Sequence, residues 1–381
     1  MKGQRIIFVL GNLELGGAER QAMILARHLS EQEKATVEVW GFNKPGPVAE
    51  ICEHHGIPSR VVPLPFDSNR LESIRHVAHL LREARPDVLL PYTWLPNVVC
   101  GFVWKWTGAR LCVWNQRDEG LFLPKTTWER WAVQRTPRFI SNSHAGARFL
   151  IEKLKVDLPR VHVVHNGIER STPGMGRTAW RKRLEIDEAS FVACMVANLH
   201  TNKDHETLLK AWRTVMTTLE QSGRNPTLVL AGRHDGAYES LLALTRELKI
   251  EHGVRFAGAV NDVAGLLSAA DVGVFSSRSE GCPNGVLECM AAWLAVAATD
   301  IEGVREVMGS SEFLATVGDA DALSHTILKL AADPAMCSMI GAQNRKRILE
   351  KYDARRMCEQ FVEIIAPSVL CFLCLFVAKY F

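Results

Sequence analysis

Two glutamates stand at positions 280 and 288 of the segment SRSEGCPNGVLECMAAWL. We expect a strand to end just before Glu280 and a helix to begin at Pro283. Proline has no amide proton, and the first turn of a helix does not need one. The free amides of Asn284 and Gly285 would then attract an anion. Since carboxylates accept hydrogen bonds from sugar hydroxyls, this pattern suits a ligand with phosphates and vicinal hydroxyls. The alternative is that Glu280 is a loop charge and Glu288 a solvated helix residue.

A second glycine-rich turn, GNLELGGAERQ, follows the first apolar run of the chain. Gly16 and Gly17 allow a ligand to approach the main chain, and the helix opened by the next residues favours an anion at its start. The spacing does not fit Gly-x-Gly-x-x-Gly, which argues against a dinucleotide fingerprint. A purely structural turn is an equally good interpretation of this segment taken alone.

The histidine and cysteine patterns predict no metal requirement. The thirteen histidines include no His-Glu-x-x-His motif and no group at metal-ligand spacing. Cys371 and Cys374 form a Cys-x-x-Cys pair without a second pair to complete a zinc site. The other cysteines are scattered through apolar stretches, as is typical of reduced, buried thiols in a cytosolic protein.

Composition excludes several classes of protein. The 381 residues carry 45 Lys and Arg against 42 Asp and Glu, and 47% of the side chains are hydrophobic. This balance is typical of globular chains with a core, and without a run of like charges it gives no reason to expect nucleic acid as a partner. We therefore expect a cytoplasmic protein of about two domains with a cleft between them.

Short apolar runs alternate with helical-period stretches along most of the chain, as in RIIFVLG, ERQAMILARHL and ATVEVWGF. This alternation predicts the α/β class, with two Rossmann-like doubly wound domains that face each other. A polar Gly- and Pro-bearing stretch after Arg170 interrupts the alternation and predicts a linker. The expected division is an N-terminal domain over 1–170, a linker over 171–189, a C-terminal domain over 190–350, a helix over 351–366 that packs back on the N-terminal domain, and an apolar tail over 367–381.

The apolar tail is broken near its start by Pro367, and its charge-free core from Val369 to Ala378 is too short for a membrane-spanning helix, which needs about 20 residues. We expect either a docked tail that covers an apolar groove or a peripheral contact with the inner face of the cell membrane.

Taken in order, several motifs resemble the retaining family 4 glycosyltransferases of the GT-B fold. These are GGAER at 16–20, HNGI at 165–168, VANLHTNKDHETLLKAW at 196–212, VRFAG at 254–258, and the Glu-Gly-x-Pro-Asn…Glu-x-Met-Ala block that begins at Glu280. The resemblance covers residues from about 5 to about 365, and the joint occurrence of the motifs is much more specific than any one of them.

The resemblance implies roles for particular residues. Glu288 would bind the ribose, and Glu280 would lie near the donor sugar and serve in catalysis. Lys203 would neutralise the leaving diphosphate, a role that an ammonium at a strand end can fill without a metal. The set expected at the donor is Gly16, Gly17, Asn198, Lys203, Arg233, Gly281, Pro283, Asn284, Gly285 and Glu288.

This chain departs from the family at three positions. Asn198 stands where the family usually has an arginine beside the diphosphate, so either Lys203 acts alone or Arg233 supplies the second cation. Tyr92 and Thr93 stand where a histidine often lies near the acceptor, and Glu302 replaces a commoner glycine. The other acceptor-side candidates follow a strand of the N-terminal domain and are Arg117 and Asp118.

The expected function is a hexosyltransferase-type retaining glycosyltransferase without a cofactor or metal, in cell-surface glycan or polysaccharide biosynthesis. Its donor would be a nucleotide-diphosphate sugar of the UDP or GDP type, bound by the C-terminal domain, and its acceptor a glycan or lipid-linked glycan at the N-terminal domain. The alternatives are a sugar-nucleotide epimerase, a phosphorylase, or a catalytically silent subunit that retains the donor pocket.

Overall fold

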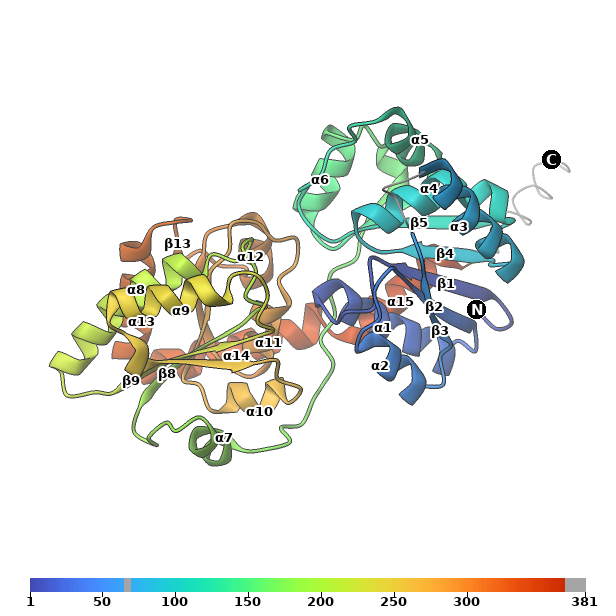
Figure 1. The fold of residues 1–381 in the computed structure, drawn as a ribbon. Helices are drawn as coiled ribbons and strands as arrows, with labels where there is room; N and C mark the ends of the chain where they lie inside the picture. The colour runs from blue at the N-terminus through green and yellow to red at the C-terminus, as the bar shows by residue number, and fades with distance from the viewer. Residues whose placement is uncertain (65–69, 367–381) are drawn as a thin grey trace, which may run out of the picture.

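A computed structural model of the chain describes residues 1–64 and 70–366. Two α/β units lie side by side, each built on one sheet (Figure 1). This arrangement confirms the predicted fold class of two Rossmann-like domains.

The N-terminal unit alternates strands with helices from its first residues. Its elements are β1 (Arg5–Leu10), α1 (Gly17–Glu31), β2 (Thr36–Phe42), α2 (Val48–His54), β3 (Ser59–Val62), α3 (Arg70–Ala84), β4 (Val88–Pro91), α4 (Trp94–Thr107), β5 (Leu111–Gln116), α5 (Thr127–Arg135), β6 (Arg138–Ser141), α6 (His144–Glu152), the 3₁₀ turn η1 (Leu158–Arg160) and β7 (Val161–Val163).

The C-terminal unit repeats the alternation. Its elements are α7 (Arg177–Arg183), β8 (Phe191–Val196), α8 (His205–Gln221), β9 (Pro226–Ala231), α9 (Tyr238–Leu248), η2 (Glu251–Gly253), β10 (Val254–Gly258), α10 (Val263–Ser268), β11 (Val272–Phe275), α11 (Asn284–Ala291), β12 (Ala295–Thr299), α12 (Glu302–Met308), β13 (Leu314–Ala315), α13 (Ala320–Ala332) and α14 (Pro334–Lys351). A last helix, α15 (Ala354–Ile365), follows.

Both sheets are parallel, and in both the strand order reverses once. The orders are β3-β2-β1-β4-β5-β6-β7 and β10-β9-β8-β11-β12-β13. The reversal falls between β1 and β4 in one sheet and between β8 and β11 in the other, and the loops after these strands part there to leave a crevice. Ligand-binding residues are therefore expected after β1, β4, β8 and β11.

The inner strands are buried and largely apolar because helices cover both faces of each sheet. All residues of β4, β5, β9 and β12 are buried, as expected for parallel strands between two helical layers. The helices contribute amphipathic faces, such as the α8 face that carries Leu208, Trp212 and Val215.

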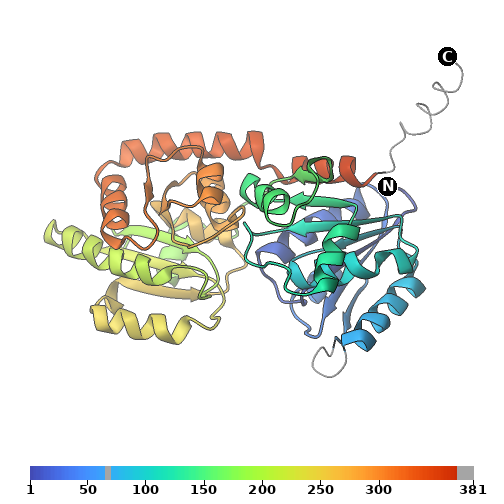
Figure 2. The same cartoon turned by 90° about the horizontal axis from the view of Figure 1, so that it is seen from above.

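The end of the described chain returns to the N-terminal unit. In Figure 2, α14 runs along the C-terminal unit and α15 continues onto the N-terminal unit. Met357, Phe361 and Ile365 of α15 belong to the same buried apolar cluster as residues of β1 and α1. The two units are thus joined at two places, near residue 170 and between α14 and α15.

The polar segment that follows residue 170 and leads through α7 into the C-terminal unit is anchored against that unit rather than extended. It contains α7, whose Arg181 guanidinium is fully buried and bonds to the Asp271 carboxylate. Asp262 accepts hydrogen bonds from the backbone N–H groups of Gly174 and Met175 at 3.0 and 2.9 Å.

None of the helices in the described ranges is long and apolar enough to cross a membrane. The predicted tail, 367–381, lies outside the described residues.

Candidate active site

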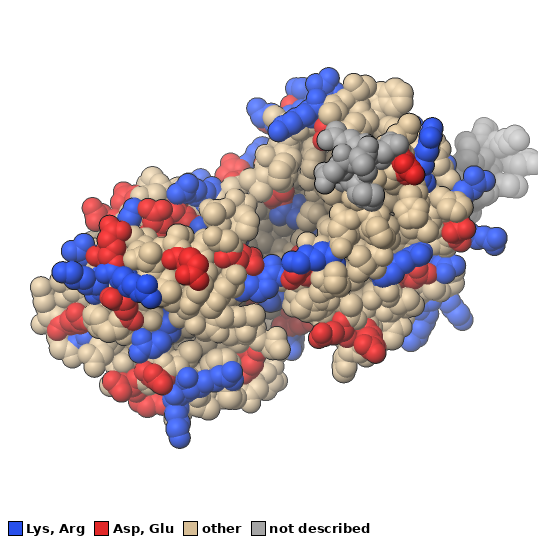
Figure 3. All heavy atoms as spheres, viewed as in Figure 1, with Lys and Arg blue, Asp and Glu red and all other residues tan. Residues whose placement is uncertain are grey.

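A cavity of about 1050 Å³ lies between the two units, lined by residues of both. Figure 3 shows the corresponding hollow, with basic side chains at its edge. The volume is at the upper end of the range of small-molecule sites. Of the predicted donor and catalytic residues, the cavity wall includes Gly16, Gly17, Asn198, Lys203, Arg233, Glu280, Asn284, Gly285 and Glu288.

Lys203 and Glu280 meet at the carboxyl ends of two neighbouring strands. Lys203 follows β8 and Glu280 follows β11, and their side chains form an ion pair. The Ser277 hydroxyl donates a second hydrogen bond to Glu280 Oε1 at 2.8 Å. The pair places an ammonium and a carboxylate side by side in the cavity, where one can bind phosphate oxygens and the other sugar hydroxyls.

Helix α11 points its amino end into the same region. Gly285 lies so close to β8 that a Cβ there would be 2.2 Å from the Val196 carbonyl oxygen, so only glycine allows this approach. No side chain of the described residues caps the helix at Pro283, which leaves the first amides available to a ligand.

Glu288 lies one turn into α11 and forms an ion pair with Arg20 of α1 on the other unit. Burial raises the pKa of the Glu288 carboxyl, and the Arg20 charge partly opposes that shift. Arg20 was not among the predicted site residues. The GGAER motif was the available signal, but position in the sequence does not reveal a partner on another domain.

Arg233 follows β9 and reaches the N-terminal unit. Its guanidinium donates to Glu14 Oε2 at 3.0 Å, and its backbone N–H donates to Asn198 Oδ1 at 3.1 Å. Its Nε is buried without a hydrogen-bond partner among the described residues. Arg233 also lines an adjoining cavity of about 380 Å³. The guanidinium is paired with Glu14 and Asp235, and only the backbone of Arg233 contacts Asn198, so the idea that Arg233 replaces the family arginine stays a prediction.

A polar network joins the units at the amino end of α11. Asn166 Nδ2 donates to the Cys282 carbonyl at 2.7 Å and to Asn284 Oδ1 at 2.8 Å, while Gln21 exchanges two hydrogen bonds with the backbone of Gly167. Asn284 Nδ2 donates in turn to the Gly17 carbonyl at 3.1 Å. Gln21 and Asn166 were not predicted as site residues, although HNGI and GGAERQ were noted as motifs.

The predicted acceptor-side residues lie in different environments. The prediction that Tyr92 contacts the acceptor is corrected, because its side chain is fully buried in the core. Its ring lies beneath the Arg117 guanidinium, 4.5 Å from it. Burial raises the pKa of Tyr92. Arg117 does line the cavity.

Four further predicted residues lie outside the cavity wall. Asp118 accepts hydrogen bonds from Gln116 and from the Gly120 backbone, and so holds a turn. Thr93 precedes α4 with a φ of 69°. Pro283 directly precedes α11. A Cβ at Gly281 would be 2.3 Å from Asn142 Oδ1, so glycine serves the packing of this loop.

The structure brings together three possible metal ligands that spacing along the sequence did not indicate. His144, His165 and Glu306 offer ligand atoms that lie within 4.8 Å of one another. These residues come from three separate segments, so spacing along the sequence could not reveal them.

Both halves of the chain match family models. Residues 15–172 match the model described as Glycosyltransferase Family 4, and residues 176–347 match the model described as glycosyl transferases group 1. The boundary between the matches falls in the polar segment between the units.

Among curated proteins, EpsD of Bacillus subtilis, which carries a provisional glycosyltransferase name, is 32% identical over 205 residues, or 52% of each chain. An N-acetylgalactosaminyltransferase of Campylobacter jejuni, whose name specifies a diphospho-undecaprenol-linked substrate, is 28% identical over 177 residues, or 46% of this chain and 44% of that protein. These matches span about half the length of the relatives.

A solved structure of Anabaena Alr3699/HepE with UDP and glucose superposes with a TM-score of 0.81 at 20% identity, covering 95% of this chain and 99% of that one. The structural agreement shows that the fold is GT-B.

Proposed function

This chain carries the two domains of the family 4 and group 1 glycosyltransferases in order, and we propose that it transfers a sugar from a nucleotide-diphosphate donor to an acceptor hydroxyl with retention of configuration. The observation that carries the proposal is the convergence of Lys203, Glu280 and Glu288 on one cavity at the amino end of α11. The solved structure of Anabaena Alr3699/HepE, which holds UDP and glucose, supports the same donor class.

On binding, the donor would replace the ion pairs Lys203–Glu280 and Arg20–Glu288 by its own contacts with these side chains. The diphosphate takes the Lys203 ammonium and the amides at the start of α11, while the ribose hydroxyls donate to the Glu288 carboxylate. Arg233 supplies a second positive charge from the next strand. Two cations and a helix amino end stabilise the charge that grows on the leaving diphosphate, which is the role a metal fills in other transferases.

The acceptor would approach from the N-terminal unit, where Arg117 lines the cavity. Its hydroxyl attacks the anomeric carbon on the face from which the diphosphate leaves, and the leaving phosphate oxygen takes the hydroxyl proton. The protein then contributes positioning and electrostatic stabilisation rather than a strong base. Closure of the units excludes water and so limits hydrolysis of the donor.

A lipid-linked glycan is the acceptor class that the surface favours. Trp106 and Trp131 are about half exposed and flank Phe102, with ring centroids 5.3 and 6.4 Å from the Phe102 ring. The Arg135 guanidinium lies 5.6 Å from the centre of the Trp106 ring, and the Lys105 ammonium lies over the ring of the neighbouring Trp104. We call Phe102, Lys105, Trp106, Trp131 and Arg135 the aromatic patch. Aromatic rings with basic neighbours suit an anionic bilayer surface, and the lipid-linked substrate named for the Campylobacter relative is of that class. The contact through the tail 367–381 stays a prediction.

The first test is a thermal-shift series with UDP, GDP, ADP and NAD on the wild type and on Glu288→Ala. A ligand at about 100 times its dissociation constant stabilises the native state by about 2.7 kcal/mol, which a melt resolves. We expect one nucleoside diphosphate to stabilise the wild type and to lose most of that effect in the variant. Glu206→Ala is the matched control, because Glu206 forms an ion pair with Lys210 on the exposed face of α8.

A second assay separates the alternatives. Release of nucleoside diphosphate only when an acceptor is present supports a transferase, whereas conversion of the sugar nucleotide without acceptor would identify an epimerase. Phosphate-dependent formation of a sugar phosphate would identify a phosphorylase. Donor binding without turnover over a broad panel of acceptors would identify a silent subunit.

A further inference from the structure

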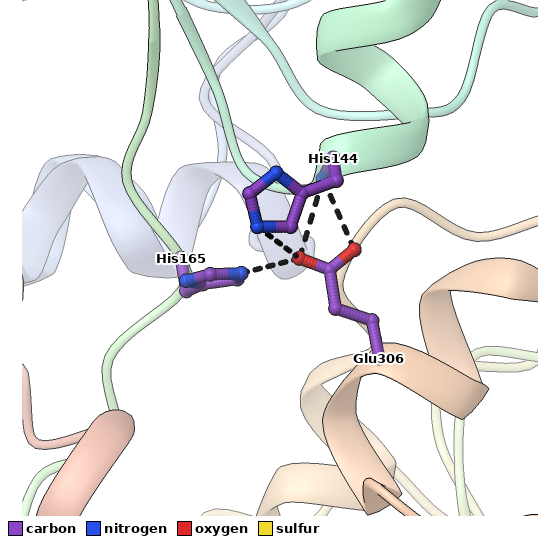
Figure 4. Close-up of side chains that lie close together, drawn as sticks. All are labelled: His144, His165 and Glu306. Carbon is purple, nitrogen blue, oxygen red and sulfur yellow. Dashed lines mark hydrogen bonds and ion pairs between the residues drawn. The ribbon is translucent and has the colours of Figure 1, made fainter.

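Three metal-ligating side chains from both units meet outside the donor cavity. His144 begins α6, His165 follows β7, and Glu306 lies in α12 of the other unit. Figure 4 shows both imidazole rings turned toward the Glu306 carboxylate. His165 Nε2 lies 2.5 Å and His144 Nε2 3.8 Å from Glu306 Oε1.

The surrounding structure holds the carboxylate in place. The His144 backbone N–H donates to both carboxylate oxygens, at 3.2 and 3.0 Å. Arg347 and the Tyr352 hydroxyl donate to the Glu306 carbonyl at 2.9 and 3.1 Å, which fixes the backbone of this turn of α12. Such supporting hydrogen bonds are typical of metal ligands, because they orient the donor atoms.

The cluster also has the access that an ion needs. The His144 side chain is 65% exposed, against 17% for Glu306, so the site is open to solvent on one side.

We propose that His144, His165 and Glu306 bind one divalent transition-metal ion, such as Zn²⁺, that bridges the two units. Two imidazoles and one carboxylate are a recurrent zinc donor set that leaves a fourth position open. Bonds of about 2.0–2.1 Å place neighbouring ligands of a tetrahedral ion about 3.3 Å apart. The ligand atoms, which all lie within 4.8 Å of one another, reach that geometry if the exposed His144 ring moves inward and His165 retreats from Glu306.

An ion here would restrain the movement of the units. His165 directly precedes Asn166, which bonds to Cys282 and Asn284 at the donor cavity. A bridge between His165 and Glu306 therefore ties the units together one residue away from that network. If the proposed transferase needs the units to open for product release, Zn²⁺ should slow turnover; this consequence rests on the proposed function, whereas metal binding does not.

The test is a Zn²⁺ titration of the full chain after chelator treatment, with competition against a chromogenic chelator as the readout. We expect one site per chain in the wild type, and at least about tenfold weaker binding at that site in His144→Ala and in Glu306→Gln. His144→Ala removes an exposed ring and is expected to fold. Amide hydrogen exchange in α6 and α12, which carry His144 and Glu306, should slow on Zn²⁺ addition in the wild type but not in His144→Ala or Glu306→Gln.

The matched control is His252→Ala, which removes a histidine that pairs with Glu220 at 3.1 Å on the surface of the C-terminal unit. It should bind Zn²⁺ like the wild type. Equal Zn²⁺ affinity in wild type, His144→Ala and Glu306→Gln would overturn the proposal, as would binding without any change in exchange at α6 and α12. Either result leaves the donor-binding test of the proposed function unaffected.

Discussion

At the scale of single residues, each carboxylate expected to bind the donor is already paired with a cation. Glu280 is paired with Lys203, and Glu288 with Arg20. The pairs keep partly buried charges compensated before a ligand arrives, since an unpaired buried charge is costly. Donor binding then replaces one set of ionic contacts by another, so the affinity reflects a difference between the two sets.

Lys203→Ala should lower the turnover number by about 10²- to 10³-fold, because the growing charge on the diphosphate loses a fixed positive partner. Initial rates of nucleoside diphosphate release at saturating donor measure this effect. Lys210→Ala is the control, since Lys210 also forms an ion pair with a glutamate but lies on the exposed face of α8. A similar loss in both variants would contradict the role of Lys203.

Arg233→Ala tests whether this arginine substitutes for the one that Asn198 replaces. We expect a fall in turnover of at least about tenfold, well beyond that of an ordinary surface change. Arg233→Lys should recover part of the activity, because the charge returns without the planar fork. Turnover of the alanine variant equal to that of wild type would show that Lys203 acts alone.

At the scale of elements, the loops after β8 and β11 position the site. These strands lie at the point where the order of the sheet reverses, so their loops diverge and leave the amino end of α11 open. Helix α8 begins in the same place, and its first residue, His205, is buried with both ring nitrogens lacking a hydrogen-bond partner among the described residues. The element that follows Lys203 therefore begins with a buried imidazole, which burial keeps uncharged at neutral pH.

His205 should make stability depend on pH. Burial lowers its pKa to about 4, from 6.5 in the unfolded chain. Between these values the unfolded chain binds a proton that the folded chain does not, so the free energy of unfolding falls as the pH falls from about 6.5 to about 4. Urea melts over this range should give a flatter profile for His205→Leu than for the wild type.

The control for this prediction is His252→Leu, which removes an exposed histidine and should keep the wild-type profile. The slope attributable to one proton is at most about 1.4 kcal/mol per pH unit. An unchanged profile in His205→Leu would show that other groups cause the acid sensitivity.

At the scale of the whole molecule, the two units have different surfaces. The N-terminal unit carries the aromatic patch, whereas Trp293 is an exposed tryptophan of the C-terminal unit.

The double variant Trp106→Ser, Trp131→Ser should reduce co-sedimentation with phosphatidylglycerol vesicles by at least about tenfold, because two exposed indoles no longer insert at the interface. Neutral phosphatidylcholine vesicles should bind the wild type more weakly, since the basic side chains lose their partners. Trp293→Ser is the control. A deletion of residues 367–381 separates the patch from the tail: if the deletion alone abolishes binding and the double variant binds normally, the patch has no part in the contact.

The sequence was sufficient to predict the fold class, and most of the residues predicted for the donor site line one cavity. The alternation of apolar runs with helical-period stretches reflects local geometry, and it predicts the fold class. The residues just after β8 and β11 are expected at a crevice because the carboxyl ends of parallel strands lie at the same edge of the sheet. Lys203, Glu280 and Glu288 were identified mainly through the family resemblance, and the order of the motifs indicated glycosyltransferases, as the two family models do.

Only the tertiary structure decided which side chains meet across the units. Arg20 pairs with Glu288, and His165 with Glu306, although each pair is separated by more than a hundred positions along the chain. Tyr92 follows its strand as an accessible residue would, yet Phe8 and Arg117 pack against its ring and its side chain is buried. Local periodicity carries information about strands, helices and their ends, whereas contacts between domains depend on how two complete surfaces dock, and no local pattern encodes that.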